Sequence, residues 1–159
     1  MTPQVQNLTY TYDNRQYIAS ITNGITNAVQ TFGYDSQGRL TSVASAQLGN
    51  SQFSYDTLGN RIARSGVLNE SYTVDSDSNR LTQITRGSQQ RTLSYDAAGN
   101  VIQEQGFNGQ SRSYVYNANN RMVQAGATTY DYNALGQRVR KPTGSVSTHF
   151  IYSPTGQLL

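Results

Sequence analysis

The sequence predicts an all-β fold built from tandem β-hairpins whose short strands run up and down. Two observations predict it: one motif recurs through the 159 residues, and turn-forming residues recur at fixed places within it. In addition, no segment has apolar residues that recur every 3.6 positions without Gly or turn-forming residues among them, which argues against helices. With a turn signal about every ten residues, we expect roughly sixteen short strands.

Each repeat is centred on an aromatic residue followed by Asp. Eight motifs align on this pattern at spacings of 16 to 22 residues, with Val in place of the aromatic in one of them and Asn or Ser in place of Asp in three. They begin at Tyr12, Tyr34, Tyr55, Val74, Tyr95, Tyr116, Tyr132 and Tyr152. Because the motifs extend through the chain, we expect residues 1–159 to form a single continuous array of about eight repeats.

The residues after the aromatic are typical of a turn. An Asp side chain can accept a hydrogen bond from the backbone two residues on, which opens the turn. The Asp residues at this place are Asp13, Asp35, Asp56, Asp75 and Asp96. Gly three residues further on supplies the positive φ that a tight reversal needs. Five repeats have it, as Gly38, Gly59, Gly99, Gly136 and Gly156, while Gln16, Ser78 and Asn120 hold this place elsewhere.

Apolar residues on both sides of the turn predict a hairpin. A large apolar residue stands two positions before the aromatic, and an aliphatic residue or Met follows six or seven positions after it. Residues two apart share a face of a strand, so Phe53 and Tyr55 would place two rings side by side. A lone hairpin is marginal in water, so the repeats must stack, and we expect the aromatic stripe to form the core. Further turn signals between repeats include Asn23-Gly24 and Pro142-Thr143-Gly144.

Composition narrows the classes of function. Only 35% of the residues are hydrophobic and 13% are charged, which argues against a thick core. The net charge is +3, but the Arg residues are spread along the repeats instead of forming a basic stripe, so we expect no nucleic-acid binding. There is no Cys, hence no disulfide or thiolate metal site. The first four residues do not resemble a signal peptide, and no stretch is apolar enough to insert in a membrane.

The candidates for catalytic or metal chemistry are weak. His149, the single His, lies in an alternating segment that predicts a strand. Asp75, Asp77 and Asn79 resemble the start of a calcium loop, but Arg80 stands where that loop requires Gly. The repeated Asp residues could pair for glycoside hydrolysis, yet they all occupy one turn position. We therefore expect no enzyme activity, no cofactor and no metal.

The repeated Arg residues allow two interpretations. They follow the turn, at Arg39, Arg61, Arg80, Arg121 and Arg138. In the first interpretation, their stems pack over Tyr rings and their guanidinium groups pair with a neighbouring Asp. In the second, a ladder of polar and aromatic side chains binds glycans. The first is favoured, and a possible glycan partner stays open.

The motif itself resembles the tyrosine-aspartate (YD) repeats of the Rhs family, which also occur in C components of insecticidal toxin complexes and in teneurins. The resemblance rests on the segments that begin at Tyr34, Tyr55, Tyr95 and Tyr132, in which Asp or Asn follows Tyr and Gly follows three residues later. It covers nearly the whole chain. It implies that the hairpins form a curved or spiralling antiparallel β-sheet strip, part of a shell around a C-terminal toxin.

The resemblance also implies a function. The chain would be a structural, non-enzymatic shell or scaffold segment of a bacterial Rhs-type protein, secreted, at the cell surface or delivered by a secretion system. Its partners would be neighbouring YD repeats and an enclosed toxin polypeptide, and we expect no separate toxin domain in this chain. The alternative function is a carbohydrate-binding or adhesive surface repeat. We also expect self-association through end strands whose backbone groups are unpaired.

Overall fold

The computed structural model describes residues 6–159, and these contain strands and turns but no helix. The predicted all-β fold class is confirmed. Within the described residues there is no helix with the length and apolar character required to cross a membrane. Residues 1–5, on which the expectation of no signal peptide depends, lie outside the described part of the chain.

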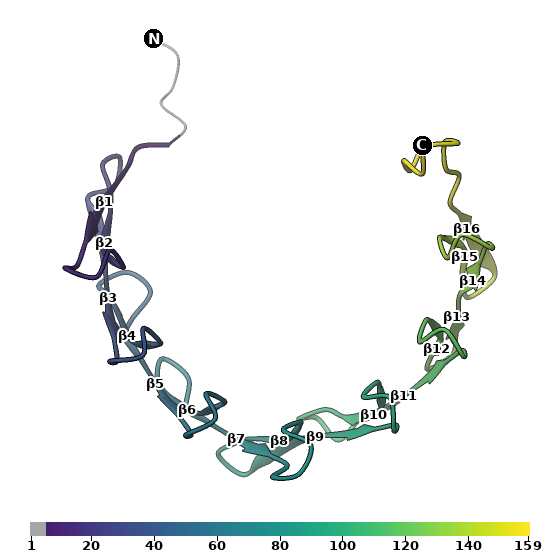
Figure 1. Cartoon of the computed structure of the whole chain (residues 1–159), viewed down its shortest axis with the longest axis horizontal. Coiled ribbons are helices and arrows are strands. Elements are labelled where there is room, and N and C mark those ends of the chain that lie inside the picture. Colours follow the sequence, from purple (N-terminus) through teal and green to yellow (C-terminus); the bar gives the residue numbers. More distant parts are fainter. Residues whose placement is uncertain (1–5) are drawn as a thin grey trace. The chain divides into compact units, whose positions relative to one another are not determined.

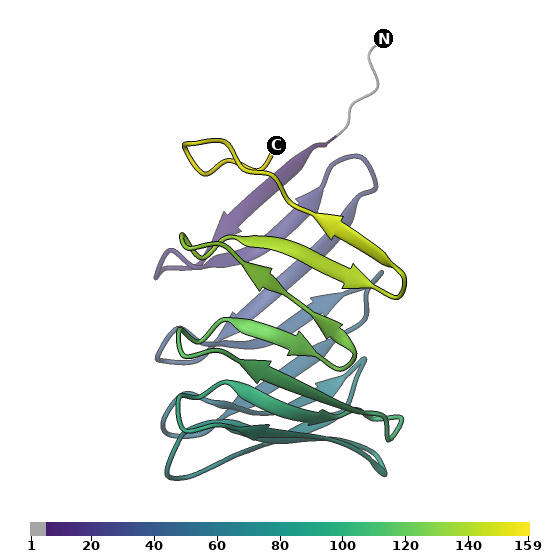
Figure 2. The same ribbon diagram turned by 90° about the vertical axis from the view of Figure 1, so that its right-hand side faces the viewer.

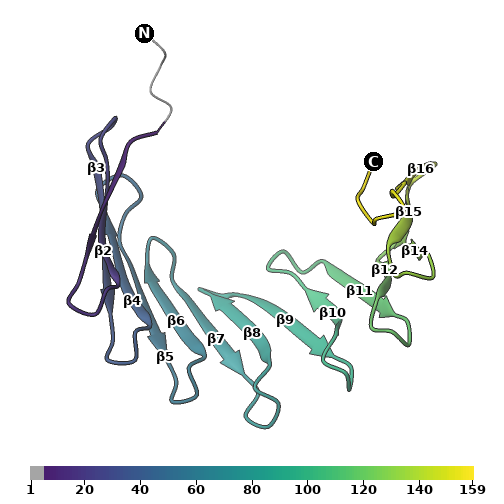
Figure 3. The same cartoon turned by 45° about the horizontal axis from the view of Figure 1, so that its top comes forward.

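The first compact unit covers residues 1–88. Its eight described strands are β1 (Leu8–Tyr12), β2 (Ile18–Asn23), β3 (Ala28–Tyr34), β4 (Leu40–Ser45), β5 (Ser51–Tyr55), β6 (Arg61–Gly66), β7 (Glu70–Val74) and β8 (Leu81–Arg86). Each strand pairs antiparallel with the next one in the sequence, so the sheet has no crossover. Within this unit the hairpins follow a curved path (Figures 1 and 3).

The second unit covers residues 89–159 and continues the same hairpin pattern. Its strands are β9 (Gln89–Tyr95), β10 (Val101–Gln105), β11 (Ser111–Tyr116), β12 (Met122–Ala125), β13 (Thr128–Thr129), β14 (Asp131–Tyr132), β15 (Arg138–Thr143) and β16 (Val146–His149). The strands β9 to β13 are adjacent in sequence order, and β14, β15 and β16 form a three-stranded sheet (Figure 2). The last motif forms no strand: Tyr152 and Leu158 make an isolated bridge.

A one-residue bulge follows the turn in seven hairpins. In the first of them, Thr11 is opposite Ser20 and Tyr12 is opposite Ile18, so that Ala19 is the extra residue. The same shift recurs in the other six hairpins. A bulge bends its strand and increases the local twist. A bulge at the same place in these seven hairpins therefore adds a similar bend at each of them.

The bulge corrects the prediction of which residue faces the motif aromatic. The apolar residue after the turn was expected to face the first strand, and in three repeats this residue is Ile62, Ile102 or Val139. Instead, Tyr55 is opposite Arg61, Tyr95 is opposite Val101 and Tyr132 is opposite Arg138. The expected residues are the extra residues of their bulges. Ile62 is 39% exposed and Ile102 is 38% exposed, so neither is covered by the first strand of its hairpin.

The aromatic stripe is not an enclosed core. None of the hydrophobic residues in the described part of the chain is buried, and the only buried polar residues there are Ser45 and Ser51. Most motif aromatics are half-buried, whereas Tyr10 and Tyr12 on β1 are exposed. The expectation of interior rings is therefore wrong, because no second layer of the described residues covers the sheet.

The turns between repeats are of more than one kind. The Asn23-Gly24 signal does not form a two-residue turn, since Asn23 is opposite Ala28 and the four residues 24–27 form the loop. Its positive φ falls on Asn27, not on Gly24. Gly144, at φ 59°, does belong to a two-residue turn, because Thr143 is opposite Val146. Turns were predicted at both places, and the structure shows that their loops differ in length.

Candidate functional site

The motif Asp organises its turn through both carboxylate oxygens. In the second repeat, Asp35 Oδ1 accepts hydrogen bonds from the backbone N–H groups of Gln37 at 3.0 Å and Arg39 at 2.9 Å. Asp35 Oδ2 accepts the Arg39 Nε–H at 2.6 Å. The third repeat has the same pattern, in which the Asn60 side chain donates to Asp56. The bond to the backbone two residues on agrees with the prediction, and the bond four residues on was not foreseen.

These hydrogen bonds hold the motif carboxylates in the ionised form. The Asn60 and Asn100 side chains lower the pKa of Asp56 and Asp96 below the ordinary value of 3.8, and backbone N–H groups act in the same direction. At Asp35, partial desolvation raises the pKa, but the N–H groups and guanidinium of Arg39 outweigh it and lower the pKa overall. The carboxylates are thus engaged by their own turns.

Positive φ falls on the fourth residue after the motif aromatic in seven of the eight repeats, as predicted for the five motif glycines. The five motif glycines have φ values from 80° to 93°, and Gln16 and Asn120 have φ values of 67° and 56°. In the fourth repeat the residue with positive φ is Asn79, at φ 58°, and not Ser78, which holds the equivalent place in the sequence. The reason is a longer loop, because the N–H of Asp75 donates to the carbonyl of Arg80, five residues on, instead of four.

In several repeats, the hydroxyl of the motif Tyr connects one hairpin to the hairpin before it. Tyr34 donates to the carbonyl of Ile18 at 2.9 Å, and Tyr55 donates to the carbonyl of Leu40 at 2.8 Å. In the second unit, Tyr132 and Tyr152 make the equivalent bonds to Met122 and Arg138. Each acceptor is the residue opposite the preceding motif aromatic. We call this series of bonds the tyrosine ladder.

Side chains also connect successive turns. The Arg15 guanidinium donates to the carbonyl of Asp35 at 2.6 Å, and that of Arg39 donates to the carbonyl of Asp56 at 3.0 Å. Asn60 and Asn100 reach the next turn through the side-chain oxygens of Asn79 and Asn120. These contacts, together with the tyrosine ladder, fix the spacing of adjacent hairpins on the side where the turns lie.

Three of the five Arg residues after the turn fall into two groups that the sequence did not separate. Arg39 pairs with Asp35 and lies over the Tyr55 ring, with its guanidinium carbon 4.8 Å from the ring centroid. This is the favoured packing arrangement. Arg61 and Arg138 lie opposite the motif Tyr of their own hairpins and are each held between two rings.

Two Glu residues form similar clusters between repeats. Glu70 accepts a hydrogen bond from the Tyr72 hydroxyl at 2.7 Å and forms an ion pair with Arg86 at 2.6 Å. These two partners lower the pKa of Glu70. Glu104 has equivalent partners in Tyr114 and Arg91. In these clusters, both Glu carboxylates are paired with an Arg of the same sheet. No sequence motif predicted the clusters.

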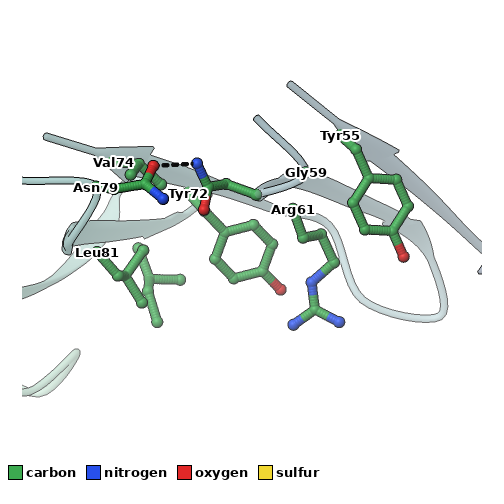
Figure 4. A pocket seen from close by; sticks show the side chains of 9 residues that line it. Tyr55, Gly59, Arg61, Tyr72, Val74, Asn79 and Leu81 are labelled. Atoms are coloured by element: carbon green, nitrogen blue, oxygen red, sulfur yellow. Dashed lines mark hydrogen bonds between the residues drawn. The ribbon is translucent and has the colours of Figure 1, made fainter. Parts of the chain in front are cut away.

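An open depression on the sheet beside Arg61 has a volume of about 450 Å³ (Figure 4). Tyr55, Arg61, Tyr72, Asn79 and Leu81 are among its lining residues. In Figure 4 the rings of Tyr55 and Tyr72 lie on either side of Arg61, and the guanidinium points away from the sheet. The hydrogen bond between Asn60 and Asn79 closes one side of the depression.

The weak candidates from the sequence do not come together as a reactive site. His149 lies on β16, exposed and opposite Arg140. Asp75 Oδ1 accepts the N–H groups of Asp77 and Ser78 and the Ser78 hydroxyl, so the predicted calcium-loop residue is engaged by its turn. In the described part of the chain, no three His, Cys, Asp or Glu side chains gather as a metal site would require.

The fold and motif geometry define a β-hairpin repeat protein of the YD type. Residues 59–159 match the family model described as teneurin YD-shell, and residues 34–67 match the RHS repeat. The chain belongs to the YD-shell family. The resemblance noted in the sequence is thereby confirmed, and the chain is a structural shell segment.

Similar proteins agree with this assignment. Double-stranded DNA deaminase toxin A of Burkholderia cenocepacia (strain H111) is 27% identical over 135 residues, and the match covers 70% of this chain and 10% of that protein. The structure titled TcdB2-TccC3-TEV matches 92% of this chain and 10% of its own, with a TM-score of 0.70 and 16% identity. The structure of TcdB2-TccC3 without hypervariable C-terminal region matches 94% of this chain and 10% of its own chain, with a TM-score of 0.68 and 15% identity. This chain spans about a tenth of the length of each of them.

Proposed function

We propose that this chain is a non-enzymatic wall segment of a shell that encloses a toxin polypeptide. The observation that carries the proposal is the tyrosine ladder, because it uses the most regular polar group of the motif to join one hairpin to the next. A repeat that uses its Tyr and Asp side chains in this way builds an extended sheet. The related Burkholderia protein is named as a toxin, which supports an enclosed toxin as the partner.

The parent protein would be bacterial, and it would be secreted, held at the cell surface or delivered by a secretion system. The organism and toxin name of the matched relative support this, since that relative shares the repeats. The neighbouring YD repeats of the parent protein would continue the hairpin array.

Protease access in the full-length protein that contains this chain tests the proposal. One protease recognition sequence is inserted beside Leu58, which is 72% exposed at a turn tip, and another into the segment that follows the repeats. We expect the tip to be cut in the native protein, and the following segment to be cut only after urea opens the shell. Equal cutting of both sites in the native protein would show that nothing is enclosed.

A carbohydrate-binding or adhesive function is the alternative, and exposed rings are the observation that favours it. Tyr10, Tyr12 and Tyr17 are 42%, 57% and 38% exposed. Aromatic faces beside polar side chains suit sugars. A glycan array separates the two functions: a defined ligand that is lost in a Tyr12→Ala variant would favour adhesion, whereas no binding would favour the shell.

A further inference from the structure

Arg61 and Arg138 occupy equivalent places in two hairpins. Arg61 lies between the rings of Phe53 and Tyr72, with its guanidinium carbon 5.5 Å and 4.9 Å from the ring centroids. Arg138 lies between Tyr130 and Phe150, at 5.5 Å and 4.8 Å. In both cases, one ring stands two residues before the motif Tyr of the same repeat, and the other stands two residues before the motif position of the next repeat.

These two guanidinium groups differ from others of the chain in having no anionic partner. Five Arg residues form ion pairs: Arg15, Arg39, Arg86, Arg91 and Arg140. In the described residues, neither Arg61 nor Arg138 forms an ion pair or a side-chain hydrogen bond, and both are exposed. Their contacts with two rings restrain the guanidinium groups but leave the N–H groups available to a ligand.

A guanidinium held in this way is suited to a carboxylate. Its planar fork of N–H groups matches the two carboxylate oxygens, and stacking on rings reduces the side-chain entropy lost when a ligand binds. The depression around Arg61 is open and adds the Tyr55 and Tyr72 rings, so it can take the apolar stem that carries the carboxylate. A deep pocket that would enclose a small molecule is not required for such a contact.

We propose that Arg61 and Arg138 are two equivalent sites that bind the carboxylate side chains of an acidic, extended polypeptide. The charges are complementary, because the chain has a net charge of +3 and these two cations are not neutralised within the described sheet. The inference rests on the proposed function for the identity of the natural ligand, which would be an acidic stretch of the enclosed polypeptide. The binding chemistry itself does not depend on enclosure.

The test uses the 159-residue chain and a labelled probe peptide with alternating Glu and Ala. Affinity is measured by fluorescence anisotropy for the wild type and for Arg61→Gln, Arg138→Gln and the double variant. Arg140→Gln is the matched control, since it removes the same charge from an exposed Arg that is paired with Asp131. Circular dichroism shows whether each variant keeps its sheet. The Arg Nε–H resonances in a two-dimensional 1H–15N spectrum report contact with the peptide directly.

We expect each single variant to raise the Kd at least threefold and the double variant about tenfold, while Arg140→Gln changes it less than twofold. Shifts of the Arg61 and Arg138 Nε–H resonances should accompany binding. Equal weakening by all three single variants would reduce the effect to general charge attraction and overturn the proposal. Binding of trigalacturonate but not of the peptide would overturn the choice of a polypeptide. Neither of these outcomes changes the result of the protease-access experiment, so that experiment tests the proposed function independently of peptide binding.

Discussion

Removing one hydroxyl from the tyrosine ladder should weaken the joint between two hairpins. Tyr55→Phe keeps the half-buried ring and its contact with Arg39 but deletes the 2.8 Å hydrogen bond to the carbonyl of Leu40. A typical intramolecular hydrogen bond contributes about 0.5–1.5 kcal/mol net. Because this bond is part-buried, we expect the free energy of unfolding to fall by about 1 kcal/mol. The temperature midpoint should fall by roughly 2–4 °C for a chain of this size.

Urea unfolding followed by far-ultraviolet circular dichroism is the assay. Tyr17→Phe is the matched control, because Tyr17 keeps its ring contact with Tyr34 at 5.1 Å and its hydroxyl donates no hydrogen bond in the described residues. We expect Tyr17→Phe to change the stability by less than about 0.5 kcal/mol. A Tyr55→Phe variant as stable as the wild type, or a control that loses as much, would refute the role assigned to the ladder.

Three further predictions concern the turn, its charge and the sheet edge. Gly59 lies at φ 93° with open space where a Cβ would stand, so Gly59→Val should lower the thermal midpoint well below that of Gly59→Asn, and equal shifts would contradict the turn strain. Asp56 and Asp96 have lowered pKa values in the folded state, so their contribution to stability is present above pH 3.8 and is lost as the pH falls through the folded values. The double variant Asp56→Asn, Asp96→Asn should therefore lose less stability than the wild type between pH 5 and pH 2, as measured by urea midpoints, and an unchanged acid slope would count against this origin. Finally, β1 pairs only with β2 in the described sheet, so we expect the 17.5 kDa chain to self-associate at that edge, and a single monomer peak in sedimentation velocity at all concentrations would oppose this.

The sequence predicted the hairpins because turn chemistry and strand alternation are local. Asp35 followed by Gly38 identifies a turn without knowledge of any other repeat, and the structure has the turn at that place. Asn can take the place of Asp in the same turn, since Asn117 Oδ1 accepts the N–H groups of Asn119 and Arg121 as Asp35 does in its own turn. Loss of the charge at Asn117 therefore leaves the hairpin intact.

The bulge was not predictable from the motif alone. An aliphatic residue occurs six or seven positions after the aromatic, and that variation was treated as one position. The structure distinguishes the two positions. In the third repeat, the residue six positions after the aromatic, Arg61, lies opposite Tyr55, and the residue seven positions after it, Ile62, is the extra residue of the bulge. Two residues that oppose one lie close together on the bulged strand, so an apolar side chain can occur at either place. A sequence pattern reports this only as an irregular spacing.

The depth of burial and the partners of the Arg residues also required the structure. Burial depends on whether a second layer covers the rings, and no local pattern records such a layer. Arg39 and Arg61 stand one motif position apart and were treated as equivalent, yet Arg39 pairs with Asp35 and Arg61 with no carboxylate in the described residues. Glu70 and Tyr72 lie on β7, and Arg86 lies on β8. Their contacts depend on how the two strands pair, which the spacing of these residues in the sequence does not reveal.

The most direct test of the central claim is an electron cryo-microscopy map of the full-length protein that contains this chain. If the chain is a wall segment, the hairpins of residues 6–159 will form part of a continuous wall, and density for another polypeptide will lie on the enclosed side. A map in which these hairpins form an open rod, with both faces of the sheet in contact with solvent and no enclosed density, would contradict it.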